Sequence, residues 1–326
     1  MAREKVLVTG AAGKVGRELV KILLKKDYAV RVLIHKNIPR DMDLNKIEIA
    51  NGDLNNPDSL EHSLEGIDTV CHLAAAFDIF PPYRFEIDND IVYRINAEGT
   101  YILMEAIRKN KKVKHIVFGS SESVYDSDAR NRTRAITEKD GLFPARFYSL
   151  TKIIGEDLVK GYKYLYNIDF TILRFAWILD ASDVLRIYEY ETWEDILSEK
   201  DRKELSPKCS SGNALLLPVY ENGKPRIDHI IDARDAASLC FLCIEHDNMA
   251  RNEVFNAAGP KPFNYESMIK IISDKLGKNY FKGVIKNRVP YKISNSKAEK
   301  ILRYRPEYAI ENTILEALGE EGRKIN

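Results

Sequence analysis

Short apolar runs alternate with segments of helical periodicity along the first half of the chain. The strand-like runs cover residues 5–9, 30–35, 47–50, 69–73, 115–119 and 170–175. After the first run, Val15, Leu19, Ile22 and Leu23 recur at the spacing of one helix face. This alternation predicts βαβ units around a parallel sheet, and right-handed crossovers make such a sheet doubly wound.

The pattern changes after residue 175. Residues 182–212 are highly charged with interspersed aromatics, which fits a solvated helix, a lid or an oligomer contact. Beyond them we expect strands at 227–231 and 253–256, and helices near 235–245, 265–276, 294–302 and 311–321. No low-complexity linker separates the two patterns. We therefore predict an α/β Rossmann-type fold with a dinucleotide-binding domain at 1–176 plus 225–260. A smaller, interleaved C-terminal substrate part takes 177–224 plus 261–326.

Three glycines follow the first strand at positions 10, 13 and 16. Gly10 permits a tight turn, Gly13 leaves room for a pyrophosphate at the backbone, and Gly16 lets the helix pack close to the strand. The free N–H groups at the start of that helix attract the anion. The segment predicts a dinucleotide-binding loop made by Gly10, Ala12, Gly13, Lys14, Val15 and Gly16.

The end of the second strand indicates which dinucleotide binds. NAD sites usually place an acidic residue there to hold the ribose 2′-hydroxyl. Here His35 and Lys36 follow Ile34, and no carboxylate is present in this run. A lysine can make a charge-assisted contact with a 2′-phosphate. We therefore expect NADP in preference to NAD, with a merely solvated strand end as the alternative.

Tyr148 and Lys152 form a YxxxK pair, which a helix would place on one face. Ionising a tyrosine near pH 7 requires a pKa shift of about 3 units, or roughly 4 kcal/mol. A nearby ammonium in a partly dry site can supply such a shift. Upstream, Ser121 ends a strand where ligands of parallel sheets bind, so its hydroxyl can hold a substrate oxygen. The alternatives are a surface helix with Lys152 paired to Glu156, and a capping serine.

Together these motifs resemble the extended short-chain dehydrogenases/reductases of the NAD-dependent epimerase/dehydratase family. Further landmarks agree in order and spacing: Gly52-Asp53-Leu54, His72-Leu73-Ala74-Ala75, Asn96, Ser120-Ser121 with Val124-Tyr125, and Leu173-Arg174. The resemblance implies an enzyme that transfers hydride between the nicotinamide and a carbon bearing a hydroxyl.

The resemblance also implies roles for individual residues. Tyr148 would be the general acid/base, Lys152 would orient the nicotinamide ribose and lower the tyrosine pKa, and Ser121 would bind the substrate oxygen. The remaining positions would contact or support the cofactor: Asp53 and Leu54 beside adenine, Leu73, Ala74 and Ala75 along the dinucleotide, and Asn96 from within its helix.

Several positions depart from the family pattern. Glu122 and Ser123 follow Ser121 where the 4,6-dehydratases have Asp-Glu, which argues against dehydration. Trp177 lies near the position where many nucleotide-sugar epimerases carry an asparagine. Arg226 lies two residues away from the arginine that usually grips the diphosphate. Ser121, Glu122, Trp177 and Arg226 are thus candidate substrate contacts, and a nucleotide-diphosphate substrate is in doubt.

Composition and charge limit the partners and the cellular location that we expect. The chain has 326 residues and a net charge of +1, which argues against a nucleic-acid partner. No apolar run approaches the roughly 20 residues of a membrane span. Four cysteines make no disulfide framework, and Cys240 and Cys243 lie in an apolar run typical of a buried helix. We expect a cytoplasmic enzyme without a metal; the resemblance adds a homodimer formed by helices near 90–108 and 148–164.

Three functions remain open. The first is an epimerase that acts on a nucleotide sugar or related sugar. The second is an NADP-dependent dehydrogenase or reductase that acts on a non-nucleotide hydroxyl or ketone substrate. The third is a non-catalytic dinucleotide-binding sensor, which would not need Ser121, Tyr148 and Lys152 together.

Overall fold

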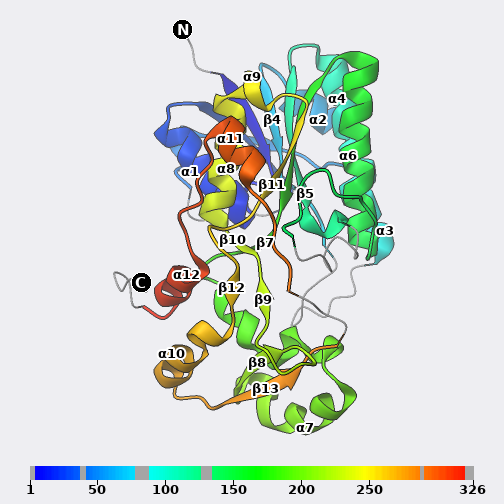
Figure 1. The fold of residues 1–326 in the computed structure, drawn as a ribbon. Helices are drawn as coiled ribbons and strands as arrows, with labels where there is room; N and C mark the ends of the chain where they lie inside the picture. Colours follow the sequence, from blue (N-terminus) through cyan, green and yellow to red (C-terminus); the bar gives the residue numbers. More distant parts are fainter. Residues whose placement is uncertain (1–3, 37–41, 78–87, 126–133, 287–289, 320–326) are drawn as a thin grey trace.

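The computed structural model describes residues 4–36, 42–77, 88–125, 134–286 and 290–319. In Figure 1 the chain forms a larger lobe around a central sheet and a smaller lobe at the opposite end of the molecule. The chain crosses between the lobes several times, so neither lobe is one continuous segment.

The larger lobe contains a seven-stranded sheet in the order β11-β6-β5-β4-β1-β2-β3, and every neighbouring pair is parallel. The strand order reverses between β1 and β4, where ligands bind in such sheets. The predicted doubly wound sheet is therefore confirmed. The strands are β1 (Lys5–Thr9), β2 (Ala29–Ile34), β3 (Glu48–Asn51), β4 (Thr69–His72), β5 (His115–Ser121), β6 (Asp169–Phe175) and β11 (Glu253–Ala257).

Helices cover both faces of this sheet. Val15, Leu19 and Leu23 recur at helical spacing, and they bury one side of α1 (Lys14–Lys25) in a cluster shared with α8 (Ala233–Glu245) and α11 (Ser296–Leu302). A second cluster lies under α2 (Pro57–Ser63), α4 (Gly99–Asn110) and α6 (Phe147–Tyr166). With both faces covered, the central strands are apolar throughout rather than alternating. Two short helices complete the lobe: α3 (Asn89–Tyr93) and α9 (Asp247–Ala250).

The smaller lobe is built from short strand pairs and three helices. β8 pairs in parallel with β13 and β9 is antiparallel to β12, while β7 pairs in parallel with β10 where the two lobes meet. The bounds are β7 (Trp177–Leu179), β8 (Leu215–Val219), β9 (Ile227–Asp228), β10 (Ile230–Asp232), β12 (Phe263–Asn264), β13 (Tyr280–Val284), α7 (Glu199–Cys209), α10 (Glu266–Leu276) and α12 (Ile310–Ala317).

Residues 182–212 contribute buried side chains to the core of this lobe and do not form one solvated helix. Only α7 is α-helical. Three short 3-10 turns precede it, at Val184–Tyr188, Tyr190–Thr192 and Glu194–Ile196, and Trp193 lies between the last two. Tyr188 and Trp193 are fully buried, and their polar atoms donate to the backbone oxygens of Tyr265 and Ile187, at 2.7 and 2.8 Å. The charged residues between the aromatics hid this core from a periodicity argument.

The strand predicted at 227–231 is split into β9 and β10 at His229. The break falls where the segment changes partner, because β9 pairs with β12 and β10 pairs with β7. The buried His229 imidazole lies at this point: its Nε2 is 3.0 Å from the oxygen of Gly259, and its Nδ1 accepts from the N–H of Ile293 at 3.0 Å. The last helix ends at Ala317, earlier than the predicted 321, and positions beyond 319 lie outside the described residues. The domain boundaries at 176, 224 and 260 stay a prediction.

We predict that Trp193→Ala destabilises the smaller lobe by about 3–5 kcal/mol, because it removes a buried aromatic side chain and leaves a cavity. Urea unfolding followed by circular dichroism measures the loss. Trp177→Ala, at a half-buried tryptophan, is the matched control and should cost less. Equal losses in the two variants would contradict Trp193 as the centre of this core.

Candidate active site

Tyr148 and Lys152 lie on the same side of α6, beside the carboxyl end of β5. The Lys152 ammonium is 5.8 Å from the centre of the Tyr148 ring and donates to the backbone oxygen of Gly119 at 2.7 Å. Lys152 is only 4% exposed. Burial lowers the pKa of Lys152 to about 8, and the carboxylate of Glu156 offsets part of the fall. The predicted pair is therefore formed, with its cation in a dry environment.

Glu156 is occupied by other partners, so the alternative of a surface Lys152–Glu156 pair is wrong. The Arg174 guanidinium holds the Glu156 carboxylate with two hydrogen bonds of 2.9 and 2.7 Å, and Ser120 donates to it at 2.7 Å. Burial pushes the pKa of Glu156 upward, but Arg174 and Lys160 outweigh that effect and hold it below its usual value. The sequence signal for this network was Glu156 one turn beyond Lys152, together with the Leu173-Arg174 landmark.

Ser121 ends β5 and begins the short turn Glu122–Val124. Its Oγ accepts a hydrogen bond from the N–H of Ser123 at 3.2 Å, so the capping alternative is also realised. Because side chains alternate along a strand, Ser120 reaches Glu156 while Ser121 points the other way. Capping fixes the Ser121 side chain and leaves its hydroxyl proton available to a ligand.

The glycine turn between β1 and α1 is tightly packed. Gly10 has φ +71°, and a Cβ there would lie 2.6 Å from the backbone nitrogen of Ala74. A Cβ on Gly16 would lie 2.3 Å from the carbonyl oxygen of Gly10. Gly13 precedes α1 without a side-chain cap, and Ala12, Lys14 and Val15 complete the turn. The first N–H groups of α1 are thus presented to a ligand, as a pyrophosphate requires.

Buried hydrogen bonds fix the segment after β4. Thr9 Oγ1 accepts from the N–H of Ala74 at 3.2 Å and lies 2.7 Å from His72 Nδ1. Burial lowers the pKa of His72 to about 3, and the charge of Lys152 adds to the fall, so the imidazole is neutral at pH 7. Thr100 holds its other nitrogen at 3.1 Å. Leu73, Ala74 and Ala75 therefore follow a fixed path beside the glycine turn.

Asn96 connects this segment to α6. It lies on a π-helical turn, Arg94–Glu98, between α3 and α4. Its Oδ1 accepts from the N–H of Ala76 at 2.8 Å, and its Nδ2 donates to the oxygen of Ala76 at 2.6 Å and to Thr151 Oγ1 at 3.0 Å. π-helical turns are frequent at functional sites. Asn96 thus joins the segment after β4 to α6 through Thr151, a partner that the sequence did not reveal. Its role in supporting the cofactor stays a prediction.

The far end of the predicted cofactor site is more open. His35 Nε2 lies 3.4 Å from Asp53 Oδ2; His35 and Lys36 are exposed and Asp53 is half-buried. Leu54 is buried and packs against Gly99. A Cβ added to Gly99 would lie 2.9 Å from the Cβ of Leu54. The structure thus brings His35 and Asp53 together at the carboxyl ends of β2 and β3.

The candidate substrate residues on the second lobe gather around Trp193. Trp177 follows β6 and meets the Trp193 ring edge-on at 6.3 Å, while the Arg226 guanidinium lies 4.7 Å from that ring. Arg226 Nε donates to Asp228 at 2.5 Å, and Asp228 also accepts from the Tyr265 hydroxyl at 2.8 Å. Glu122 lies on the other lobe, directly after Ser121.

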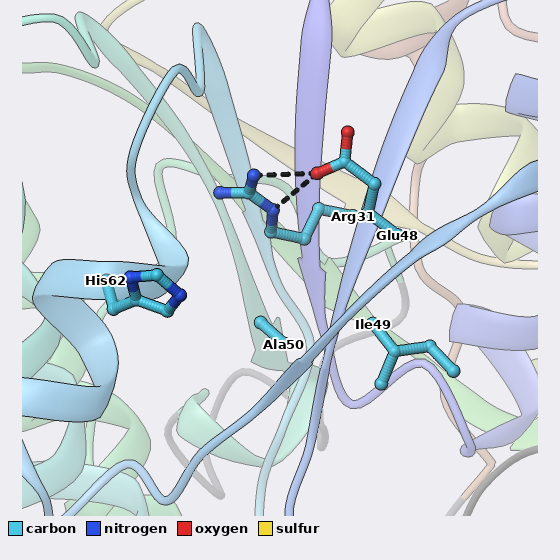
Figure 2. Close-up of a pocket in the computed structure, with 5 residues that line it drawn as sticks. All are labelled: Arg31, Glu48, Ile49, Ala50 and His62. Atoms are coloured by element: carbon cyan, nitrogen blue, oxygen red, sulfur yellow. Dashed lines mark hydrogen bonds and ion pairs between the residues drawn. The ribbon is translucent and has the colours of Figure 1, made fainter.

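A cavity of about 320 Å³ lies elsewhere, at the outer edge of the sheet, and it holds none of the predicted site residues (Figure 2). Arg31 spans it and donates to Glu48 at 3.0 and 2.6 Å. The same guanidinium donates to the oxygens of Ser63 and Glu65 at 2.9 and 2.8 Å. The Arg31–Glu48 pair therefore lies across this cavity at the β2–β3 edge of the sheet.

The sheet order, the glycine turn and the buried lysine define a dinucleotide-binding protein of the Rossmann class. Gly10 and Gly16 cannot carry side chains, the N–H groups of α1 face the turn, and the Lys152 ammonium has no carboxylate hydrogen-bonded to it in the described part of the chain. These features fit a dinucleotide phosphate and a ribose hydroxyl. Residues 6–258 match the model of the NAD dependent epimerase/dehydratase family. The chain belongs to this family of extended short-chain dehydrogenase/reductase enzymes, and its cofactor is an NAD(P) dinucleotide.

Known proteins show the same relationship. The chain is 25% identical over 324 residues to UDP-glucose 4-epimerase from Halalkalibacterium halodurans, covering 95% of this chain and 93% of that protein. It is 28% identical over 242 residues to L-arabinose 1-dehydrogenase (NAD(P)(+)) from Haloferax volcanii, covering 71% and 89%. Two other curated relatives are matched over only 55% and 40% of their lengths.

Solved structures confirm the fold. A short-chain dehydrogenase/reductase superfamily protein from Agrobacterium tumefaciens with bound NAD superposes with a TM-score of 0.81, at 26% identity and 97% coverage of both chains. UDP-glucuronic acid 4-epimerase from Bacillus cereus follows with a TM-score of 0.73 at 24% identity, covering 97% and 98%.

Across the described ranges, no three His, Cys, Asp or Glu side chains come together as metal ligands. None of the helices in this part of the chain combines the length and apolarity that crossing a membrane requires. Cys240 and Cys243 are buried in α8 as free thiols, as predicted for core residues.

We predict that Gly16→Ala weakens dinucleotide binding by about tenfold or more, because the new methyl group must displace the Gly10 carbonyl. Fluorescence titration with NADH measures the dissociation constant. Gly161→Ala on α6 is the control, since no atom lies within 4 Å of its added methyl group. Unchanged affinity in Gly16→Ala would contradict the proposed role of the turn.

Lys152 gives a prediction on pH. Its pKa is about 8 in the folded protein and about 10.4 in the unfolded chain, so between these values the unfolded state binds more protons. Stability from this group therefore rises as the pH rises from 8 towards 10. We expect the wild type to gain free energy of unfolding relative to Lys152→Met over this interval. Urea titrations at pH 7, 8, 9 and 10 measure the difference, and a constant or falling difference would contradict a desolvated ammonium.

Proposed function

We propose that the protein is an NAD(P)-dependent oxidoreductase that transfers hydride at a hydroxyl-bearing carbon of a sugar. The first candidate reaction is the epimerisation of a nucleotide sugar. The observation that carries this proposal is the buried Lys152 ammonium beside the Tyr148 ring at the carboxyl end of β5. Such a cation favours the ionised phenol, and a tyrosinate can take the proton of a substrate hydroxyl.

Three residues carry the reaction in this proposal. Ser121 binds the substrate oxygen, Tyr148 exchanges its proton, and Lys152 holds the nicotinamide ribose while stabilising the tyrosinate. The bound cofactor supplies the hydride acceptor or donor. Arg174 neutralises Glu156, so the charge of Lys152 remains directed at the tyrosine and the ribose. Asn96 and Thr151 hold the cofactor segment against α6.

The cofactor contacts are proposed at three places. Gly10, Ala12, Gly13, Lys14, Val15 and Gly16 receive the pyrophosphate at the start of α1. Leu73, Ala74 and Ala75 line the middle of the dinucleotide. Asp53 and Leu54 flank the adenine, with His35 and Lys36 beside the adenine ribose. NAD is bound in the Agrobacterium structure, and the Haloferax relative is named for NAD(P)(+). For this chain we propose NADP as the preferred cofactor, because both candidate side chains at the ribose are basic.

The choice between the two cofactors is testable. His35→Ala combined with Lys36→Ala should weaken NADPH binding by about tenfold and leave NADH binding within about twofold, because only NADPH carries the 2′-phosphate. Fluorescence titrations of the two cofactors measure the ratio. Lys46→Ala, another exposed lysine on the same lobe, serves as the control. An equal loss for both cofactors would place these residues at a shared part of the dinucleotide.

The pairing of Arg226 favours a second candidate reaction. The Arg226 side chain donates through Nε to the Asp228 carboxylate, and the two form a formally neutral pair. A nucleotide diphosphate would gain little from such a pair. Trp177 and Glu122 would offer aromatic and hydrogen-bonding surface to an uncharged sugar. This observation supports net oxidation or reduction of a non-nucleotide hydroxyl or ketone substrate.

Tyr148→Phe tests whether the site is catalytic. We expect a loss of about 10²- to 10⁴-fold in kcat with unchanged NADH affinity, since only the proton-transfer group is removed. The assay follows dinucleotide reduction or epimer formation with UDP-hexoses and free aldoses. Tyr164→Phe, at a tyrosine that is 91% exposed on the same helix, is the control. Full activity in Tyr148→Phe would support a different mechanism, and binding without turnover in the wild type would support the non-catalytic sensor.

We also propose a homodimer in the cytoplasm. The contact would be made by the helices near 90–108 and 148–164 of the two subunits. On α4 and α6, apolar side chains are exposed at Tyr101 (49%), Leu150 (38%) and Leu165 (65%). All four cysteines are free and buried, which suits a reducing compartment. The proposed partners are a small-molecule substrate and a second copy of the chain.

A further inference from the structure

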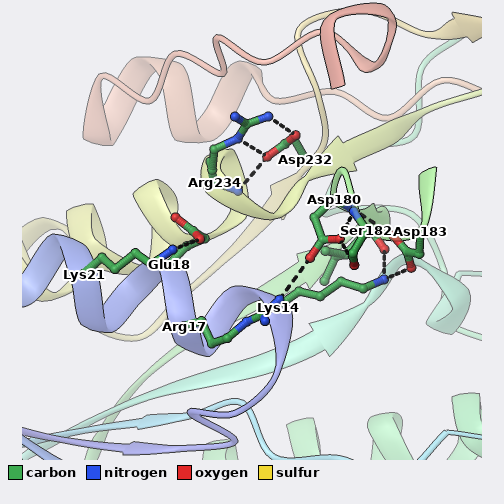
Figure 3. A network of polar contacts seen from close by, with 10 residues as sticks. Lys14, Arg17, Glu18, Lys21, Asp180, Ser182, Asp183, Asp232 and Arg234 are labelled. Carbon is green, nitrogen blue, oxygen red and sulfur yellow. Dashed lines mark hydrogen bonds and ion pairs between the residues drawn. The ribbon is translucent and has the colours of Figure 1, made fainter. Parts of the chain in front are cut away.

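Two ion pairs join the cofactor helix α1 to the first loop of the smaller lobe (Figure 3). Lys14 Nζ contacts the carboxylate of Asp183, and Arg17 Nη2 lies 3.3 Å from Asp180 Oδ2. Lys14 also approaches the backbone oxygen of Ile178 at 3.4 Å. Lys14 and Arg17 are three positions apart on one face of the helix. Their acidic partners, Asp183 and Asp180, are also three positions apart on the loop. We call these four side chains the clasp.

The loop of the clasp is braced before it meets the helix. Asp180 Oδ1 accepts from the N–H and the hydroxyl of Ser182, at 2.9 and 2.5 Å, and Asp183 Oδ1 accepts from the N–H of Asp180 at 3.1 Å. Each aspartate thus uses one oxygen to shape the loop and the other to reach α1. The loop presents a preformed pair of carboxylates, so little ordering is required when the clasp closes.

The clasp connects two functional regions directly. Lys14 is the first residue of α1, the helix end proposed to receive the pyrophosphate. On the other side, Val184, Ile187 and Tyr188 follow Asp183 immediately and are fully buried in the core of the smaller lobe. The loop begins where β7 ends, after Trp177 and the carboxyl end of β6. Separating the lobes at the pyrophosphate therefore requires breaking the clasp.

We propose that the clasp controls how fast the dinucleotide leaves: it holds the smaller lobe closed at the start of α1, and its opening is a step in cofactor release. This inference rests on the dinucleotide site proposed above. The four side chains are between 20% and 33% exposed, so water and salt reach the pairs and the clasp can open without unfolding either lobe. Closure of this kind suits an enzyme that keeps its cofactor through several steps.

The test is stopped-flow measurement of NADH release from the purified full chain, with excess NAD as the displacing ligand. Asp180→Asn with Asp183→Asn removes both charges but retains the oxygens that shape the loop. We expect release about threefold to tenfold faster, in line with two partly exposed ion pairs. We also expect the release rate of the wild type to rise more steeply with NaCl than that of the double variant.

The control is Glu18→Gln, which breaks the 2.7 Å pair with Lys21 on the same helix without touching the other lobe. It should release NADH at the wild-type rate. If the double variant is folded and keeps both the wild-type rate and its salt dependence, the clasp does not govern release. A lower melting temperature with an unchanged rate overturns the proposal equally, because the pairs are then structural. Failure of the wild type to bind NADH or NADPH would instead refute the proposed function.

Discussion

The buried pair of Arg174 and Glu156 sets the electrostatics on which the proposed site depends. Glu156 lies one turn from Lys152 on α6 and would neutralise it if left alone. Two hydrogen bonds from Arg174 satisfy the Glu156 carboxylate, and Lys152 donates instead to the backbone oxygen of Gly119. Removing one member of a buried pair leaves an uncompensated charge, so the network holds together as a unit. A cation without a bonded carboxylate is what a neighbouring phenol needs to ionise near neutral pH.

Backbone proximity is the second constraint. The turn of Gly10 lies against the backbone of Ala74, and Gly16 lies against Gly10, so β1, β4 and α1 approach more closely than side chains would allow. Hydrogen bonds made by Thr9, His72 and Asn96 then fix the segment after β4. Asn96 also donates to Thr151 of α6, which ties this segment to the helix. The cofactor segment and the helix of Tyr148 are thereby parts of one rigid framework, as precise hydride transfer requires.

The smaller lobe follows a different principle. Its core combines aliphatic side chains with aromatic rings around Trp193. The polar atoms of Tyr188, Trp193 and Tyr265 are satisfied by nearby backbone and carboxylate groups. Charged residues separate these aromatics along the chain, so their burial produces no simple periodic pattern. The clasp joins this lobe to α1 through side chains that are more than 160 positions apart. The clasp thus adds two ion pairs to the β7–β10 strand pair that already joins the lobes.

The parallel sheet, the glycine turn and the shared helix face of Tyr148 and Lys152 were predictable from the sequence, because strand runs, glycine spacing and helical periodicity are local properties. The order of the family landmarks also predicted roles for Ser121 and Asn96. The sequence did not reveal that Arg174 binds Glu156, that Asn96 donates to Thr151 or that Arg226 pairs with Asp228. Nor did it reveal that residues 182–212 contribute buried side chains to the core of the smaller lobe. These outcomes depend on which side chains meet across the fold, and contacts between distant residues leave no local pattern.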